Sequence, residues 1–153
     1  MMVACFAVTA SADNAAIKNT AADVSLTIVL TGGTAAQETA GTAGKTEGVE
    51  KTVTGSPIPN SVFEIYLQAA DGTIGDTATA TGTTGTDGKV TFTKTGTDNA
   101  GEKLAQGRYT VKNSDLGTGQ SALVADFDVD LPMTNYQDTG FIYNVYVRKF
   151  IYL

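Results

Sequence analysis

Residues 121–131 read SALVADFDVDL, and most of this segment alternates between apolar and polar side chains. Successive side chains of an extended strand point to opposite faces, so this alternation is typical of a strand with one buried face. The pattern predicts that five residues face a core: Leu123, Ala125, Phe127, Val129 and Leu131. Between them, Asp126, Asp128 and Asp130 are expected to face solvent. The segment therefore indicates a β-sheet protein.

Shorter alternating segments occur on both sides of this stretch. They are residues 24–30 (VSLTIVL), 62–67 (VFEIYL), 89–93 (KVTFT), 108–112 (RYTVK) and 141–147 (FIYNVYV). The pairs Asp71-Gly72 and Asp87-Gly88 are typical of hairpin turns. Residues 73–86 indicate either a weak edge strand or a loop, and residues 31–58 a long surface loop.

No segment has a convincing helical period, so six or seven short strands predict an all-β, Ig-like sandwich. Its core is expected to contain Leu26, Ile28, Phe63, Ile65, Val90, Phe92, Tyr109, Val111, Phe127, Val129, Tyr143 and Val145.

Composition excludes several classes of function. The chain has 153 residues, the size of one domain, with a net charge of −6 and no cluster of basic residues. Nucleic acids and anionic membranes are therefore not expected as partners, because both require a basic patch. There is no His and one Cys, which removes the usual nucleophile pairs and most zinc sites. We expect no enzyme activity, no cofactor, no metal and no transmembrane span.

The two ends of the chain have unusual patterns. Residues 1–12 are apolar and end in Ala10-Ser11-Ala12, which predicts a partial signal peptide cleaved after Ala12. A short strand or a frayed tail is the alternative, and lipidation of Cys5 is disfavoured because apolar residues follow it. Residues 13–22 are expected to form a flexible arm and residues 23–150 the domain. The apolar C-terminal segment 141–153 suggests a truncated or frame-shifted chain.

Three short motifs resemble known sites but have a simpler interpretation. Residues 131–135 (LPMTN) match a sortase sorting signal, yet no apolar span with a basic tail follows, so a loop after a strand is preferred. Residues 138–140 (DTG) occur once, whereas aspartic proteases need two such carboxylates, so we interpret them as a turn. Asp126, Asp128 and Asp130 would stand about 6.6 Å apart along one strand face, too far to share a calcium ion.

Several segments together resemble a known family. Residues 56–66 (SPIPNSVFEIY), 86–92 (TDGKVTF) and 104–111 (LAQGRYTV) are similar to motifs of Cna-B-type domains in Gram-positive surface proteins. Residues 127–135 (FDVDLPMTN) and 139–147 (TGFIYNVYV) resemble the end of the N-terminal domain of a major pilin. The resemblance implies a Greek-key Cna-B sandwich of about seven strands in a sortase-assembled pilus.

The chain also departs from this family at chemically important positions. The family's pilin motif ends Tyr-Pro-Lys-Asn and supplies the acceptor lysine, whereas Lys149 here lies one place early without a preceding Pro. Lys149 is therefore a candidate acceptor, with a solvated lysine as the alternative, and its amine is expected to have an ordinary pKa. Leu30 and Asn113 occupy the positions of the family's crosslinking Lys and its Glu, so no intramolecular isopeptide bond is expected.

The resemblance implies a secreted structural domain of a pilus shaft at the cell wall, which contributes to adhesion. Its implied partners are other pilin subunits, a pilin-type sortase and a host surface. The alternative is a stalk or adhesin module that binds through the loop at residues 31–58. With Lys149 out of place and no credible sorting signal, we expect a monomer that does not assemble and is at best a poor acceptor.

Overall fold

The chain is an all-β sandwich of two sheets, described by a computed structural model for residues 17–34, 55–135 and 139–153. In the first sheet, β1 pairs with three strands: β11 (Asn144–Tyr152), β5 (Lys89–Phe92) and the short β2 (Ser56–Pro57). β1 itself is Ser25–Gly33. The second sheet has the order β6 (Gly96–Thr97), β4 (Ala80–Thr83), β3 (Val62–Leu67), β7 (Gly107–Asp115) and β8 (Phe127–Leu131). A separate hairpin pairs β9 (Met133–Thr134) with β10 (Phe141–Ile142).

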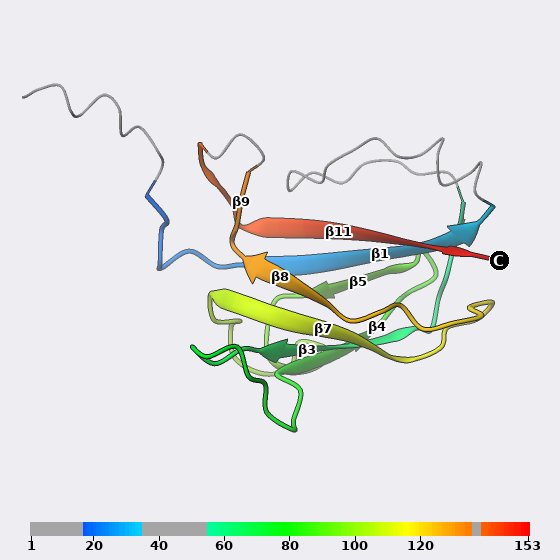
Figure 1. Cartoon of the computed structure of the whole chain (residues 1–153), viewed down its shortest axis with the longest axis horizontal. Helices are drawn as coiled ribbons and strands as arrows, with labels where there is room; N and C mark the ends of the chain where they lie inside the picture. The colour runs from blue at the N-terminus through cyan, green and yellow to red at the C-terminus, as the bar shows by residue number, and fades with distance from the viewer. Residues whose placement is uncertain (1–16, 35–54, 136–138) are drawn as a thin grey trace, which may run out of the picture.

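The predicted fold class is confirmed, and seven of the described strands have four residues or more. The described residues contain no helix, and hence no helix that could cross a membrane. Figure 1 shows the two sheets stacked face to face, with their strands running roughly along the long axis of the domain. Residues near 20 and the C-terminus lie at opposite ends.

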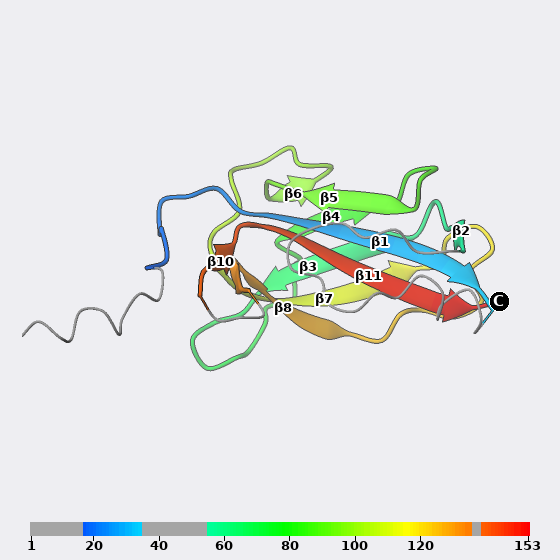
Figure 2. The ribbon, with the colours of Figure 1, turned by 90° about the horizontal axis from the view of Figure 1, so that it is seen from above.

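The first and last strands of the domain run side by side in the same direction. β1 and β11 pair in parallel over nine residues, from Ser25 opposite Asn144 to Gly33 opposite Tyr152. Figure 2 shows the two strands side by side in the first sheet. Among the described strands, β11 pairs only with β1, and β8 pairs only with β7. Within the described residues, β11 and β8 are therefore edge strands, one in each sheet, and both border the same groove.

The core lies between the sheets and contains ten of the twelve predicted residues as fully buried side chains. Phe127 and Tyr143 are only half-buried and pack against its margin. Leu131, which the alternation of residues 121–131 places in the core, is also buried. Six further buried apolar residues are not among the predicted core residues: Val24, Val29, Leu30, Ile58, Ala80 and Leu104. The predicted surface loop at residues 31–58 is wrong at both ends. β1 extends to Gly33, and the Ile58 amide donates to the Leu30 carbonyl at 3.0 Å while its side chain enters the core.

The segment that predicted the fold is only partly a strand. β8 begins at Phe127, and Leu123 and Ala125 are exposed, so the prediction that they face the core is wrong. Val124 packs against the core in their place. The Val124 amide donates to Oδ1 of the Asn113 side chain at 3.0 Å, so it is bonded to a side chain instead of to the backbone of β7.

The Asp87-Gly88 turn is present but does not form a hairpin within one sheet. The turn is closed by hydrogen bonds from Gly85 N to Lys89 O and from Gly88 N to Gly85 O, both 2.9 Å. However, β4 before the turn pairs with β3, whereas β5 after it pairs with β1. The turn therefore carries the chain from one sheet to the other.

The buried phenol of Tyr109 gives a prediction about alkaline stability. Its hydroxyl donates to the Ala105 carbonyl at 2.6 Å, and burial raises the pKa of Tyr109 to about 12 from 10.0. Above pH 10 the unfolded chain therefore ionises this phenol while the folded chain does not, so stability is lost as the pH rises from 10 to 12. We expect a loss of about 2 kcal/mol between pH 10 and pH 12, which is most of the roughly 2.7 kcal/mol that a shift of two pKa units represents in full.

Denaturant unfolding at several pH values measures this loss. Tyr109→Phe is the control, because without the hydroxyl the decline attributed to this residue should disappear. An equal decline in both proteins would show that other groups cause it.

Candidate functional site

Lys149 lies on the inner face of β11. Val145, Val147 and Ile151 have the same parity on this strand; Val145 is fully buried, and the other two pack against the core. Lys149 therefore occupies a position where the strand otherwise carries apolar residues. Its partner in the register is Leu30 of β1, which is also buried.

The Lys149 amine contacts an aromatic ring of the opposite sheet. Its Nζ lies 4.0 Å from the centre of the Phe127 ring. Phe127 is the first residue of β8 and has the same parity as the buried Val129 and Leu131. The two edge strands, β11 and β8, thus each contribute one half-buried side chain to the contact between Lys149 and Phe127.

These edges border a groove with a volume of about 600 Å³. This volume falls within the range of small-ligand sites. Phe127, Val129, Met133 and Val147 supply its apolar lining, and Lys149 is one of its two basic residues. The remaining lining residues are polar or charged: Asp128, Asp130, Thr134, Tyr146 and Arg148.

The electrostatics of Lys149 differ from the sequence-based expectation. Desolvation by burial lowers the pKa of the Lys149 amine below its usual 10.5, so the expectation of an ordinary amine is wrong. Burial disfavours the charged ammonium, which raises the fraction of neutral, nucleophilic amine at a given pH. In the described part of the chain, no carboxylate forms an ion pair with Lys149 that would oppose this effect.

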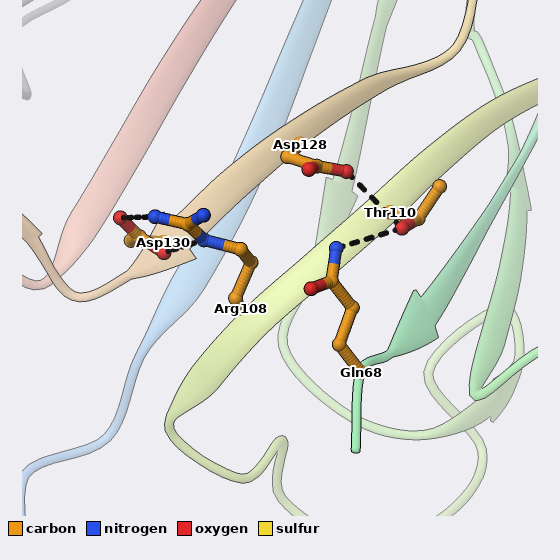
Figure 3. A network of polar contacts seen from close by, with 5 residues as sticks. All are labelled: Gln68, Arg108, Thr110, Asp128 and Asp130. Carbon is orange, nitrogen blue, oxygen red and sulfur yellow. Dashed lines mark hydrogen bonds and ion pairs between the residues drawn. The ribbon is translucent and has the colours of Figure 1, made fainter. Parts of the chain in front are cut away.

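The aspartates of β8 form a polar ladder with β7 on the outer face of the sheet. Arg108 Nε donates to Asp130 Oδ1 at 2.8 Å, and the Thr110 hydroxyl donates to Asp128 at 3.1 Å. Figure 3 shows these pairs, with the Gln68 amide donating to Thr110 at 2.9 Å. Lys112 lies 3.9 Å from Asp126 at the end of the ladder. All three aspartates are exposed, as the alternation predicts.

The described residues contain no group of three or more acidic, His or Cys side chains that could hold a metal ion. Leu131 and Pro132 are buried at the end of β8, and Met133 begins β9, so residues 131–135 occupy the predicted exit from a strand. Asn113 is buried and hydrogen bonded to the Ser61 hydroxyl at 2.9 Å. The proposed cleavage site at Ala12, together with Cys5 and Asp138, lies outside the described residues.

The sequence contains a signal for the burial of Lys149. The alternation Val145, Val147, Lys149, Ile151 places the lysine on the inner face because β11 extends beyond Val147, where the predicted strand ends. The contact with Phe127 cannot be predicted from the sequence, because it depends on how the edge strands of two sheets approach each other.

Solved structures that resemble this chain include fimbrial and pilin proteins. The fimbrial protein FimP from Actinomyces oris has a TM-score of 0.60 and 21% identity, over 86% of this chain and 30% of its own. The full-length major pilin SpaD from Corynebacterium diphtheriae has 0.61 and 21%, over 88% and 33%. The C. diphtheriae SpaA pilin, solved in complex with a signal peptide, has 0.53 and 19%, over 84% and 96%. The expected likeness to a pilin domain is confirmed for the fold.

At the level of sequence, no family profile and no curated protein matches the chain. The chain spans about a third of the length of FimP and SpaD.

Proposed function

We propose that the chain is a structural domain of a cell-surface pilus shaft and that Lys149 is the residue through which it is joined to another subunit. Other pilin subunits and a pilin-type sortase would be its partners, and it would be secreted to the cell surface. In this proposal, adhesion is a property of the assembled pilus shaft to which the domain contributes. The observation that carries the proposal is the half-buried Lys149 amine in the groove between β8 and β11, within a fold that pilins share.

The proposed reaction is an acyl transfer to the Lys149 amine. The neutral Nζ attacks the carbonyl carbon of a thioester between a sortase cysteine and the threonine of a sorting signal. A C–N bond forms, the C–S bond breaks, the thiolate leaves, and the nitrogen loses a proton to give an amide. The lowered pKa of Lys149 supports this role, because only the unprotonated amine can attack.

The groove also suits the other reactant. An extended peptide places alternate side chains on opposite faces, so it could lay apolar residues on the lining of Phe127, Val129, Met133 and Val147. One SpaA neighbour was solved with a signal peptide bound, which supports testing such a peptide.

Incubation with a pilin-type sortase and a synthetic Leu-Pro-X-Thr-Gly peptide tests the proposal. We expect one peptide adduct per chain by intact mass, with the amide mapped to Lys149. Lys149→Arg should abolish the adduct, because a guanidinium remains protonated. Lys112→Arg is the matched control, since Lys112 lies on the outer face of the sheet and pairs with Asp126. An adduct that survives in Lys149→Arg would contradict the proposal.

The alternative of a binding module at residues 31–58 has no structural observation in its favour. Most of that loop, residues 35–54, lies outside the described part of the chain.

A further inference from the structure

The Lys149 amine lies over the ring of Phe127 in the groove. A lysine side chain is long and flexible, and at a strand edge it ordinarily extends its ammonium into water. Here the Nζ remains 4.0 Å from the centre of the Phe127 ring, and both side chains are half-buried. The face of an aromatic ring carries negative electrostatic potential, which attracts an ammonium group.

Among the described residues, no ion pair takes the place of the contact between Lys149 and the Phe127 ring. Within the described residues, the ion pairs join other partners: Lys103 to Asp23, Arg108 to Asp130, and Lys112 to Asp126. The titratable and charged residues that border the same groove are Asp128 and Asp130 of β8, whose side chains lie on the outer face of the sheet, and Tyr146 and Arg148 of β11. Asp128 and Asp130 already accept hydrogen bonds from Thr110 and Arg108 of β7.

We propose that Phe127 is the positioning residue for Lys149: its ring fixes the amine at one place in the groove and so selects this lysine for acylation. This inference rests on the proposed acceptor role of Lys149. A fixed amine needs less reordering to reach a bound acyl group than a freely rotating one. The ring also replaces part of the hydration that the ammonium loses on burial, so it opposes the lowering of the Lys149 pKa.

The test compares wild type with Phe127→Leu, Phe127→Met and Phe127→Tyr in the whole chain. Each protein is acetylated with an N-hydroxysuccinimide ester across a pH series, and peptide mass spectrometry gives the rate at each lysine. We expect the Lys149 midpoint to fall by roughly half to one pH unit in the Leu and Met variants, since the ring no longer stabilises the ammonium. Phe127→Tyr keeps a ring and should restore the wild-type midpoint.

The same variants are then given the sortase and the Leu-Pro-X-Thr-Gly peptide. We expect the rate of adduct formation to fall about tenfold with Leu and Met and to recover with Tyr, because the first two leave the amine mobile. Lys112, whose Nζ lies 5.5 Å from the Tyr66 ring centre on the outer face, is the internal control and should acetylate at the same rate in every protein.

Two outcomes would overturn the inference: a Lys149 midpoint and adduct rate that are unchanged in Phe127→Leu and Phe127→Met, or a tyrosine variant that behaves like them. If wild type forms no adduct at all, the acceptor proposal fails, while the acetylation series still decides whether the ring holds the amine. Thermal unfolding shows whether each variant is folded. If Phe127→Leu does not fold, Phe127→Met takes its place in the comparison.

Discussion

Replacing Gly88 with alanine is expected to lower the free energy of unfolding by about 4 kcal/mol. Gly88 is buried at the turn between the sheets and has a φ of +75°, a conformation that costs alanine roughly 1–2 kcal/mol. An added Cβ would also collide with the Leu30 carbonyl oxygen and lie 3.1 Å from the Ile58 amide nitrogen. Overpacking against such atoms adds about 1–3 kcal/mol.

This collision cannot be relieved by a side-chain rotation, because two of the three nearest atoms belong to the backbone and the third, Pro57 Cβ at 3.1 Å, belongs to a proline ring. The Leu30 amide donates to the Gly88 carbonyl at 2.8 Å, and the Leu30 carbonyl accepts the Ile58 amide at 3.0 Å. Moving the turn outward would break the first bond, and moving β1 inward would disturb the core at Leu30. The added methyl group therefore strains the junction of three segments.

Gly75→Ala is the matched control for this variant. Its Cβ would have no neighbour within 4 Å, and its φ lies outside the left-handed region. We expect a change within about 0.5 kcal/mol, as for other surface substitutions. Urea unfolding of the two variants measures the difference, and equal losses would show that Gly88 is not the constraint described here.

Much of the sandwich could be predicted from local patterns. Residues 62–67 alternate and form β3 with the predicted bounds, and ten of the expected core side chains are buried. Local alternation is informative there because one face of the strand covers the core and the other meets solvent. The parallel pairing of β1 with β11 was not predicted, because it joins segments more than a hundred residues apart.

The candidate site was harder to predict for the same reason. The sequence identified Lys149 but assigned it an ordinary amine, since burial depends on Phe127 and on the separation of two strand edges. The prediction that Leu123 and Ala125 face the core is wrong, because alternation carries no information about distant side chains that form hydrogen bonds with this backbone. Asn113 is such a side chain, and the Val124 amide is bonded to it.

Asn113→Ala is expected to lower the free energy of unfolding by about 4 kcal/mol. The Asn113 amide nitrogen donates to Ser61 Oγ and Val62 O, both at 2.9 Å, and to the Asp115 carbonyl at 3.1 Å. Its Oδ1 accepts Gln120 Nε2 at 2.7 Å and the Val124 amide at 3.0 Å. Alanine would leave several of these groups buried without a partner, at about 1–3 kcal/mol for each unsatisfied group.

Ser114→Ala is the control, because that serine is exposed and makes one long hydrogen bond, at 3.5 Å, to the Val62 carbonyl. We expect it to change stability by less than about 0.5 kcal/mol. Hydrogen exchange supplies a local measurement: the Val124 amide should lose its protection in Asn113→Ala and keep it in Ser114→Ala. Unchanged protection at Val124 in both variants would show that Asn113 does not hold this segment.

The consequence of Asn113→Ala should extend from stability to the groove. The segment from Gln120 to Val124 leads into β8, whose first residue is Phe127. If Asn113 anchors this segment, its removal loosens the start of β8 and therefore the ring that contacts Lys149. Sortase-catalysed adduct formation at Lys149 should then fall at temperatures where the variant is still folded. A full adduct rate in a folded Asn113→Ala protein would mean that β8 holds Phe127 in place through its pairing with β7 alone.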